Sequence, residues 1–142
     1  MHARSILICA LLAATSCLHA AGLLAGVAKS DITDYNAGPV NDPSLARALV
    51  LRQGETTAVL VSVDAVAIGG IGRIGNGFLA TVRGQLEKEA GIPPASVVIN
   101  ASHCHGVVRG DTAQLVVQVV KDALKNLAPV KAGAGLGVEN RI

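Results

Sequence analysis

The sequence predicts an α/β fold built on a mixed sheet, with the element order β-β-β-α-β-α-β. Two runs rich in β-branched residues, 56–68 and 96–102, are typical of strands buried inside a sheet. Two other segments carry apolar residues at helical spacing, and they alternate with strands in the second half of the chain. This alternation favours helices packed on a mixed sheet, and 142 residues suffice for one such domain.

Five strands are expected, and turn-forming residues separate the first three. The segment 34–43 is rich in such residues, with Gly38-Pro39 and Asp42-Pro43 as its strongest signals. Gly54-Glu55 fits a tight hairpin turn between the second and third strands. The expected strands are 23–33, 44–53, 56–68, 96–102 and 129–138.

The two helices are indicated by apolar residues that fall on one side of each helix. The first carries Phe78, Val82, Leu86 and Ala90 at intervals of four, and Gly91 is expected to end it. The second has Val116, Val120, Ala123 and Leu127 on one side, with Lys121, Asp122 and Lys125 on the other. Asp111 or Thr112 is expected to cap its start.

The first 21 residues are interpreted as a secretory signal peptide, which places the mature protein outside the cell or in the periplasm. A single early cation, Arg4, precedes a short apolar run, and small residues follow near Ala20. That run is shorter than the roughly 20 apolar residues that span a bilayer. Two alternatives remain open: a lipoprotein anchored through Cys17, and a buried N-terminal helix. Without this leader Cys104 is the only cysteine, so no intramolecular disulfide can form.

Composition argues against nucleic-acid and carbohydrate binding. The formal charge is +2 for the whole chain, and removal of Arg4 with the leader lowers it further. The only aromatic residues are Tyr35 and Phe78, whereas stacking on bases needs aromatic faces. We therefore expect no nucleic-acid partner.

Two short motifs are interpreted as coincidental. Residues 70–75 match G-x-G-x-x-G between a strand and a helix, but the next strand ends in Asn100-Ala101-Ser102 without the acidic residue that a dinucleotide fold requires. A flexible connection explains this loop better. The tripeptide Arg109-Gly110-Asp111 resembles an integrin ligand, but Asp111 is better explained as a helix cap.

His103, Cys104 and His105 form the main candidate site, at the end of the predicted strand 96–102. If the strand continues, the two imidazoles lie on one face, where both can reach a single metal ion, and the thiol points away. Structural histidines at a strand end remain an alternative, as does Cys104 as a nucleophile with a histidine base. A hydrolytic zinc needs three protein ligands. Asp31, Asp64 and Glu139 are available carboxylates, but no spacing selects one of them.

Five stretches of the chain, taken in order, match the opening motifs of a known enzyme family. They are GVAKSDIT (26–33), NDPSLARALVL (41–51), VLVSVDAVAI (59–68), GIPPASVVINASHCH (91–105) and GAGLGVENRI (133–142). Together they resemble the N-terminal catalytic domain of the neutral/alkaline non-lysosomal ceramidases over about residues 25–142. Their order and spacing carry the resemblance, since no single motif is specific.

The resemblance implies a zinc-dependent amidase that hydrolyses the N-acyl bond of ceramide to sphingosine and a fatty acid. The match to the family's H-T-H implies that His103 binds the metal and that His105 is a catalytic residue that polarises the substrate amide. This chain departs from the pattern at three places: Cys104 replaces threonine, Gly106-Val107-Val108 follow where the family has S-G-P, and the loop 34–40 is shortened.

By the same resemblance, residues 22–142 are expected to be an incomplete, N-terminal part of a larger catalytic domain. The remaining zinc ligands and a family serine lie further along in complete members. We therefore expect a fragment of a secreted hydrolase that is inactive by itself, with a lipid amide such as ceramide as substrate and contact with a membrane surface. Two alternatives stay open: a non-enzymatic secreted or lipid-anchored domain of the same fold, and another H-x-H metallohydrolase.

Overall fold

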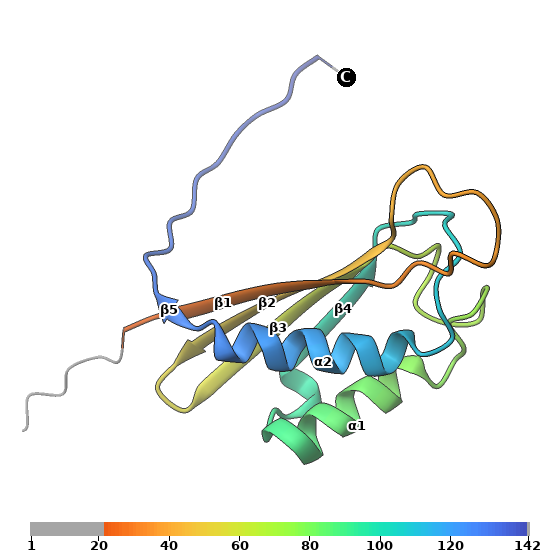
Figure 1. Ribbon diagram of the computed structural model, residues 1–142. Helices are drawn as coiled ribbons and strands as arrows, with labels where there is room; N and C mark the ends of the chain where they lie inside the picture. The colour runs from red at the N-terminus through yellow and green to blue at the C-terminus, as the bar shows by residue number, and fades with distance from the viewer. Residues whose placement is uncertain (1–21, 142) are drawn as a thin grey trace, which may run out of the picture.

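The computed structural model describes residues 22–141, so the predicted signal peptide, including Cys17, lies outside the described residues, as does Ile142 (Figure 1). The α/β fold and the order of its strands and helices are confirmed, with one short 3-10 turn added before the fourth strand. The elements are β1 (Leu24–Asp31), β2 (Leu45–Gln53), β3 (Thr56–Val63), α1 (Phe78–Ala90), η1 (Pro94–Ser96), β4 (Val97–Ala101), α2 (Thr112–Lys125) and β5 (Ala128–Pro129). Neither helix in this part of the chain is long and apolar enough to cross a membrane.

The sheet is mixed, with the spatial order β4-β3-β2-β1-β5. Strands β1, β2 and β3 form an antiparallel meander, and the hairpin between β2 and β3 turns at Gly54, which has a φ of 55°. Strand β4 pairs with β3 in parallel, and α1 makes the crossover that a parallel connection requires. The parallel pair brings the carboxyl ends of β3 and β4 to the same edge of the sheet.

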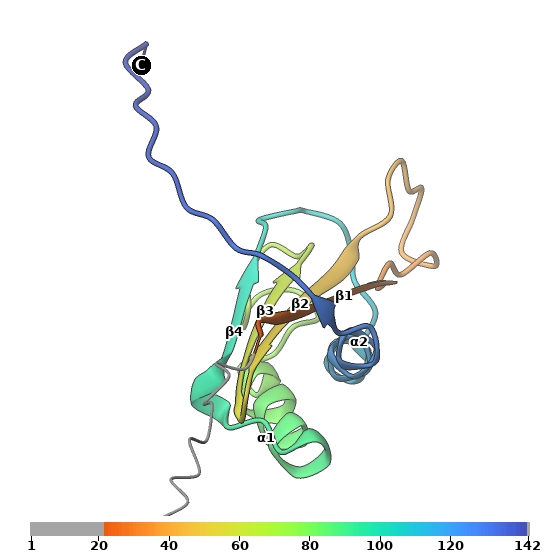
Figure 2. The same ribbon diagram turned by 90° about the vertical axis from the view of Figure 1, so that its left-hand side faces the viewer.

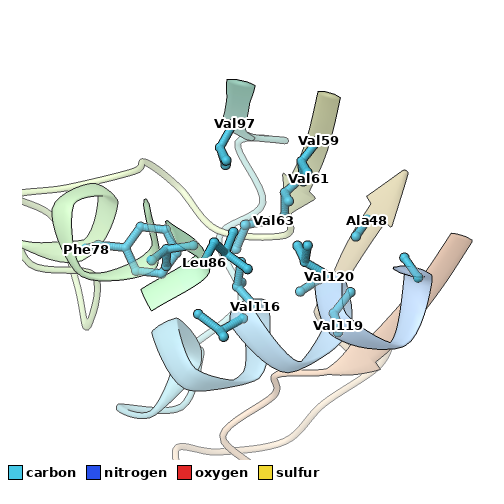
Figure 3. Packing of buried hydrophobic residues seen from close by; sticks show 14 of the residues in the cluster. Ala48, Val59, Val61, Val63, Phe78, Leu86, Val97, Val116, Val119 and Val120 are labelled. Carbon is cyan, nitrogen blue, oxygen red and sulfur yellow. The ribbon is translucent and has the colours of Figure 1, made fainter. Parts of the chain in front are cut away.

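Both helices cover one face of the sheet, and the other face is left open (Figure 2). Inward and outward residues alternate along the strands: Val59, Val61 and Val63 of β3 are buried, whereas Leu60 between them is 44% exposed. Figure 3 shows the residues that fill the space between the layers. They are Ala48, Val59, Val61, Val63 and Val97 from the strands, Phe78 and Leu86 from α1, and Val116, Val119 and Val120 from α2.

The end of α1 follows the prediction, whereas the start of α2 differs in its chemistry. Gly91 has a φ of 65° and donates its N–H to the carbonyls at the end of α1, which explains why the helix stops there. Asp111 precedes α2 but makes no side-chain capping bond. Its carboxylate instead accepts two hydrogen bonds from Arg109, at 2.8 and 2.6 Å. The prediction that a side chain of Asp111 or Thr112 caps α2 is therefore wrong. Arg109 binds the carboxylate of Asp111, and the Thr112 hydroxyl donates to the Arg109 carbonyl.

The last predicted strand, 129–138, is wrong in extent, because β5 contains only Ala128 and Pro129. These two residues pair with the start of β1, and one further bond joins the Val130 N–H to the Leu23 carbonyl at 2.9 Å. Beyond that point the described chain runs away from the sheet, as Figure 1 shows, and Leu136 is fully exposed. Three glycines within 131–141 favour this outcome, since glycine loses the most backbone entropy when it joins a strand.

Candidate functional site

The candidate site lies at the edge of the sheet where the parallel strands β3 and β4 end. Three connecting segments gather there, at the same end of the molecule: 32–44, 64–77 and 102–111 (Figure 1). Backbone bonds join them, since the Asp34 N–H donates to the Val107 carbonyl at 2.9 Å and the Arg109 N–H donates to the Ile32 carbonyl at 2.8 Å. In open α/β sheets, ligands bind at such carboxyl edges.

His103 has an unusual backbone conformation that the strand-based prediction did not include. Strand β4 ends at Ala101, and His103 has a φ of 63°, in the left-handed region. For a residue with a side chain, this conformation costs about 1–3 kcal/mol unless the surroundings stabilise it. The neighbours on both sides are held by β3 and its extension: the Ser102 N–H donates to the Val63 carbonyl at 3.0 Å, and the Cys104 N–H donates to the Ala65 carbonyl at 3.1 Å.

The two histidine rings nevertheless lie next to each other. Nδ1 of His103 is 2.9 Å from the carbonyl oxygen of Val66, which can only accept, so Nδ1 is the donor, and in the neutral ring the lone pair is then on Nε2. Nε2 of His105 lies 3.4 Å from Nε2 of His103, and the ring centroids are 5.0 Å apart at an interplanar angle of 81°. Both side chains are exposed, so a ligand can reach both nitrogens from solvent.

The separation of the two Nε2 atoms fits a shared zinc ion. Zinc–nitrogen bonds of about 2.0–2.1 Å in a tetrahedral arrangement place two ligand nitrogens about 3.3–3.4 Å apart. The proton on Nδ1 of His103, bound to a carbonyl, is also the usual outer contact of a metal-binding histidine. Within residues 22–141, however, no group of three or more histidine, cysteine or acidic side chains could hold a metal.

The three carboxylates considered from sequence lie elsewhere or are already engaged. Asp31 accepts hydrogen bonds from the Thr33 N–H at 2.8 Å and from the Tyr35 hydroxyl at 2.6 Å. Its pKa is lowered, chiefly by hydrogen bonds from the Thr33 side chain and the Tyr35 hydroxyl. Glu139 lies on the extended C-terminal segment, where it pairs with Arg141. Neither carboxylate is grouped with the histidines.

Cys104 opens on a different cavity from His105. The thiol lines a cavity of about 300 Å³ bounded by the loop 34–42, Ser44 and Gly106. His105 lines a second cavity of about 330 Å³ on the side of the glycine-rich loop, with Ile71 and Ile74. Cys104 and His105 thus line different cavities, which gives no support to Cys104 as a nucleophile with His105 as its base.

The glycine-rich loop between β3 and α1 borders the site and uses its glycines for backbone geometry. Gly70 and Gly72 have φ values of 72° and 65°, which side chains rarely allow. Arg73 forms an ion pair with Asp34 at 2.8 Å, and this pair ties the loop to the segment 32–44. The loop therefore forms one wall of the cavity beside His105.

Sequence reasoning missed the role of Asp64 in the candidate site. It was considered only as a metal ligand, but its carboxylate instead joins three segments. Oδ2 accepts from the Leu45 N–H at 3.0 Å and from Arg47 at 2.8 Å, and Oδ1 accepts from the Ser102 hydroxyl at 2.9 Å. An acidic residue directly after a buried β-branched strand was the available signal.

The pKa of Asp64 is lowered by these contacts. Burial is the largest single influence and acts to raise the pKa, but the hydrogen bonds from the Leu45 N–H, the Ser102 hydroxyl and Arg47 together outweigh it. A carboxylate with a lowered pKa stabilises the folded state above its unfolded pKa of about 3.9, and this stabilisation is lost as the pH falls through the lower, folded value.

We therefore expect the variant Asp64→Asn to lose about 1.5 kcal/mol of unfolding free energy at pH 7, and less near pH 3. Other carboxylates titrate in both proteins, so the difference between wild type and variant isolates Asp64. Urea unfolding at pH 7 and pH 3 measures it. A difference that stays constant or grows toward low pH would contradict the assignment.

Comparisons with known proteins agree with the fold. No protein-family model and no curated protein sequence matches the chain. Among solved structures, the neutral ceramidase from Pseudomonas aeruginosa matches 77% of this chain with 18% sequence identity and a TM-score of 0.61. A structure described as a ceramidase complexed with C2 matches the same share, also at 18% identity, with a TM-score of 0.60. This chain spans 22% of the length of each. The protein thus shares the α/β fold of one part of these ceramidases.

Proposed function

We propose that this chain forms the histidine-bearing part of a secreted zinc-dependent amidohydrolase that acts on the N-acyl bond of ceramide or a related lipid amide. Two observations support the proposal: the ceramidase-like fold and the exposed histidine pair at the carboxyl edge of its parallel strands. The single observation that carries it is that the two exposed rings hold their Nε2 atoms 3.4 Å apart, so that an imidazole able to bind zinc lies directly beside a second one able to contact a substrate.

In this proposal His103 is the metal ligand and His105 the catalytic residue. The bond to the Val66 carbonyl fixes the proton of His103 on Nδ1 and directs the lone pair of Nε2 outward. A zinc ion bound there would polarise the amide carbonyl and lower the pKa of a bound water toward about 7. Nε2 of His105 lies close enough to His103 to hydrogen-bond a substrate oxygen held beside that ion.

The surroundings of His105 suit an apolar substrate. The cavity that it lines, of about 330 Å³, is bounded mainly by aliphatic side chains, among them Ile71, Ile74 and Val108. Burying methylene groups in such a cavity contributes about 0.8 kcal/mol each. A fatty acyl chain attached to the scissile amide is a ligand of this kind, and a substrate presented by a membrane surface would supply it.

Secretion or periplasmic location belongs to the same proposal and is supported by residues 1–21 alone, with lipid anchoring through Cys17 as the alternative. A non-enzymatic domain of the same fold is the second candidate function. The observation that favours it is that residues 22–141 hold no set of three metal ligands.

We expect the 142-residue chain to bind zinc weakly and to show no ceramide hydrolysis by itself. Two imidazoles cannot hold a catalytic ion with three protein ligands and an open position for water. Isothermal titration with zinc measures the binding, and release of fatty acid from a fluorescent ceramide measures turnover. Robust zinc-dependent turnover would contradict the expected inactivity. An absence of any zinc binding would favour the non-enzymatic domain.

A further inference from the structure

The contacts on either side of His103 lead to one short segment, residues 63–66 at the end of β3. Three bonds join the segment 102–104 to 63–66: the N–H groups of Ser102 and Cys104 donate to the carbonyls of Val63 and Ala65, and Nδ1 of His103 contacts the carbonyl of Val66. The conformation of His103 therefore depends on where 63–66 lies. Asp64, in the middle of that segment, binds back to β2 through its N–H, which donates to the Leu45 carbonyl at 2.9 Å, and through its carboxylate.

One carboxylate oxygen of Asp64 accepts hydrogen bonds from the sheet, and the other accepts one from the candidate site. Oδ2 receives the Leu45 N–H and the Arg47 guanidinium, both on β2. Oδ1 receives the hydroxyl of Ser102, the residue directly before His103. The side chain of Asp64 is only 15% exposed, whereas its partner Arg47 is 49% exposed and Ser102 lies at the surface. The carboxylate thus links the central strand β2 to Ser102, the residue directly before the left-handed His103.

We infer that Asp64 is a positioning residue that, through Ser102, holds His103 in its left-handed conformation with Nε2 directed toward His105. Asp64 does not touch the proposed metal. It fixes the direction of the His103 ring and the proton on Nδ1, and the spacing of the two Nε2 atoms follows from these. The expected effect of Asp64 on zinc affinity rests on the proposed function, whereas its expected effect on the orientation and tautomer of the His103 ring does not.

Two substitutions break this link at different points. Asp64→Asn keeps the shape but replaces one acceptor oxygen by an NH2 group that can only donate, so the side chain can no longer accept from both β2 and Ser102. Ser102→Ala removes only the bond between the carboxylate and the residue before His103, and leaves the contacts of Asp64 with β2. Asp122→Asn is the matched control, because Asp122 also accepts two side-chain hydrogen bonds, from Gln118 and Lys125, but on the exposed side of α2.

The test combines long-range ¹H–¹⁵N spectra of the imidazoles with zinc titration of the same proteins. In wild type and Asp122→Asn we expect His103 to show a single tautomer with its proton on Nδ1. In Ser102→Ala and Asp64→Asn we expect a mixture of tautomers and a zinc dissociation constant raised about tenfold, which corresponds to about 1.4 kcal/mol.

The inference is overturned if Ser102→Ala, or a folded Asp64→Asn, keeps the wild-type tautomer. Should Asp64→Asn fail to fold, Ser102→Ala decides alone. If no protein in the set binds zinc but the tautomer changes as expected, the zinc proposal fails while the positioning role stands. If zinc binds and the tautomer is unaffected, the zinc proposal stands and the positioning role fails.

Discussion

Replacing His103 by alanine is expected to remove measurable zinc binding, with a rise of at least a hundredfold in the dissociation constant. His103 is the ring whose Nδ1 is bonded to the Val66 carbonyl, so its Nε2 is the nitrogen best prepared to donate a lone pair. Within residues 22–141 no comparable hydrogen bond orients Nδ1 of His105, so the remaining ring is the poorer ligand. Isothermal titration of the wild type and the variant measures the change.

His105→Ala separates the two roles proposed for the pair. If His105 acts on the substrate, this variant keeps most of the zinc affinity. If both rings bind the ion, as their 3.4 Å separation also allows, its affinity falls as far as that of His103→Ala. Cys104→Ala is the control within the same segment, because the thiol lines the other cavity, and its zinc affinity should match the wild type. Equal affinities in all four proteins would contradict the metal site.

The periodic parts of the fold could be predicted from sequence because burial on one face imposes a spacing on the residues. Val59, Val61 and Val63 alternate with outward residues, and Val82 and Leu86 repeat at helical spacing, so both element types were identified with small errors at their ends. The length of the last strand was overestimated because an apolar pattern was present without a partner strand. The apolar residues of 129–138 suggested burial, but only Ala128 and Pro129 have a neighbouring strand to pair with.

The candidate site could be predicted only in part. The spacing of His103 and His105 indicated that their rings lie together, and they do, but the backbone conformation that brings them together differs from the expected one. The prediction assumed an extended chain, whereas β4 stops at Ala101 and His103 is left-handed. This conformation results from bonds to 63–66, residues nearly forty positions away in sequence. No local pattern encodes such contacts, and the part played by Asp64 was missed for the same reason.

Substitution of Gly26 by alanine is expected to cost about 3 kcal/mol of unfolding free energy, at the upper end of the range for overpacked interiors. Gly26 lies on the face of β1 that α2 covers. An added methyl group would overlap the Ala123 carbonyl oxygen and lie 3.1 Å from the backbone nitrogen of Leu127. Backbone atoms cannot turn aside as a flexible side chain can, so the end of α2 must move away from the sheet.

Because domains are stable by only about 5–15 kcal/mol, such a loss should lower the melting temperature by on the order of 10 °C. Gly84→Ala is the matched control: Gly84 lies within α1, is exposed, and has open space where a methyl group would be added. There we expect a gain of about 0.5–1 kcal/mol, since alanine favours the helix. Thermal unfolding followed by circular dichroism measures both variants. If Gly26→Ala melts at the wild-type temperature, α2 does not pack directly on β1, and the layer that supports the site is arranged differently.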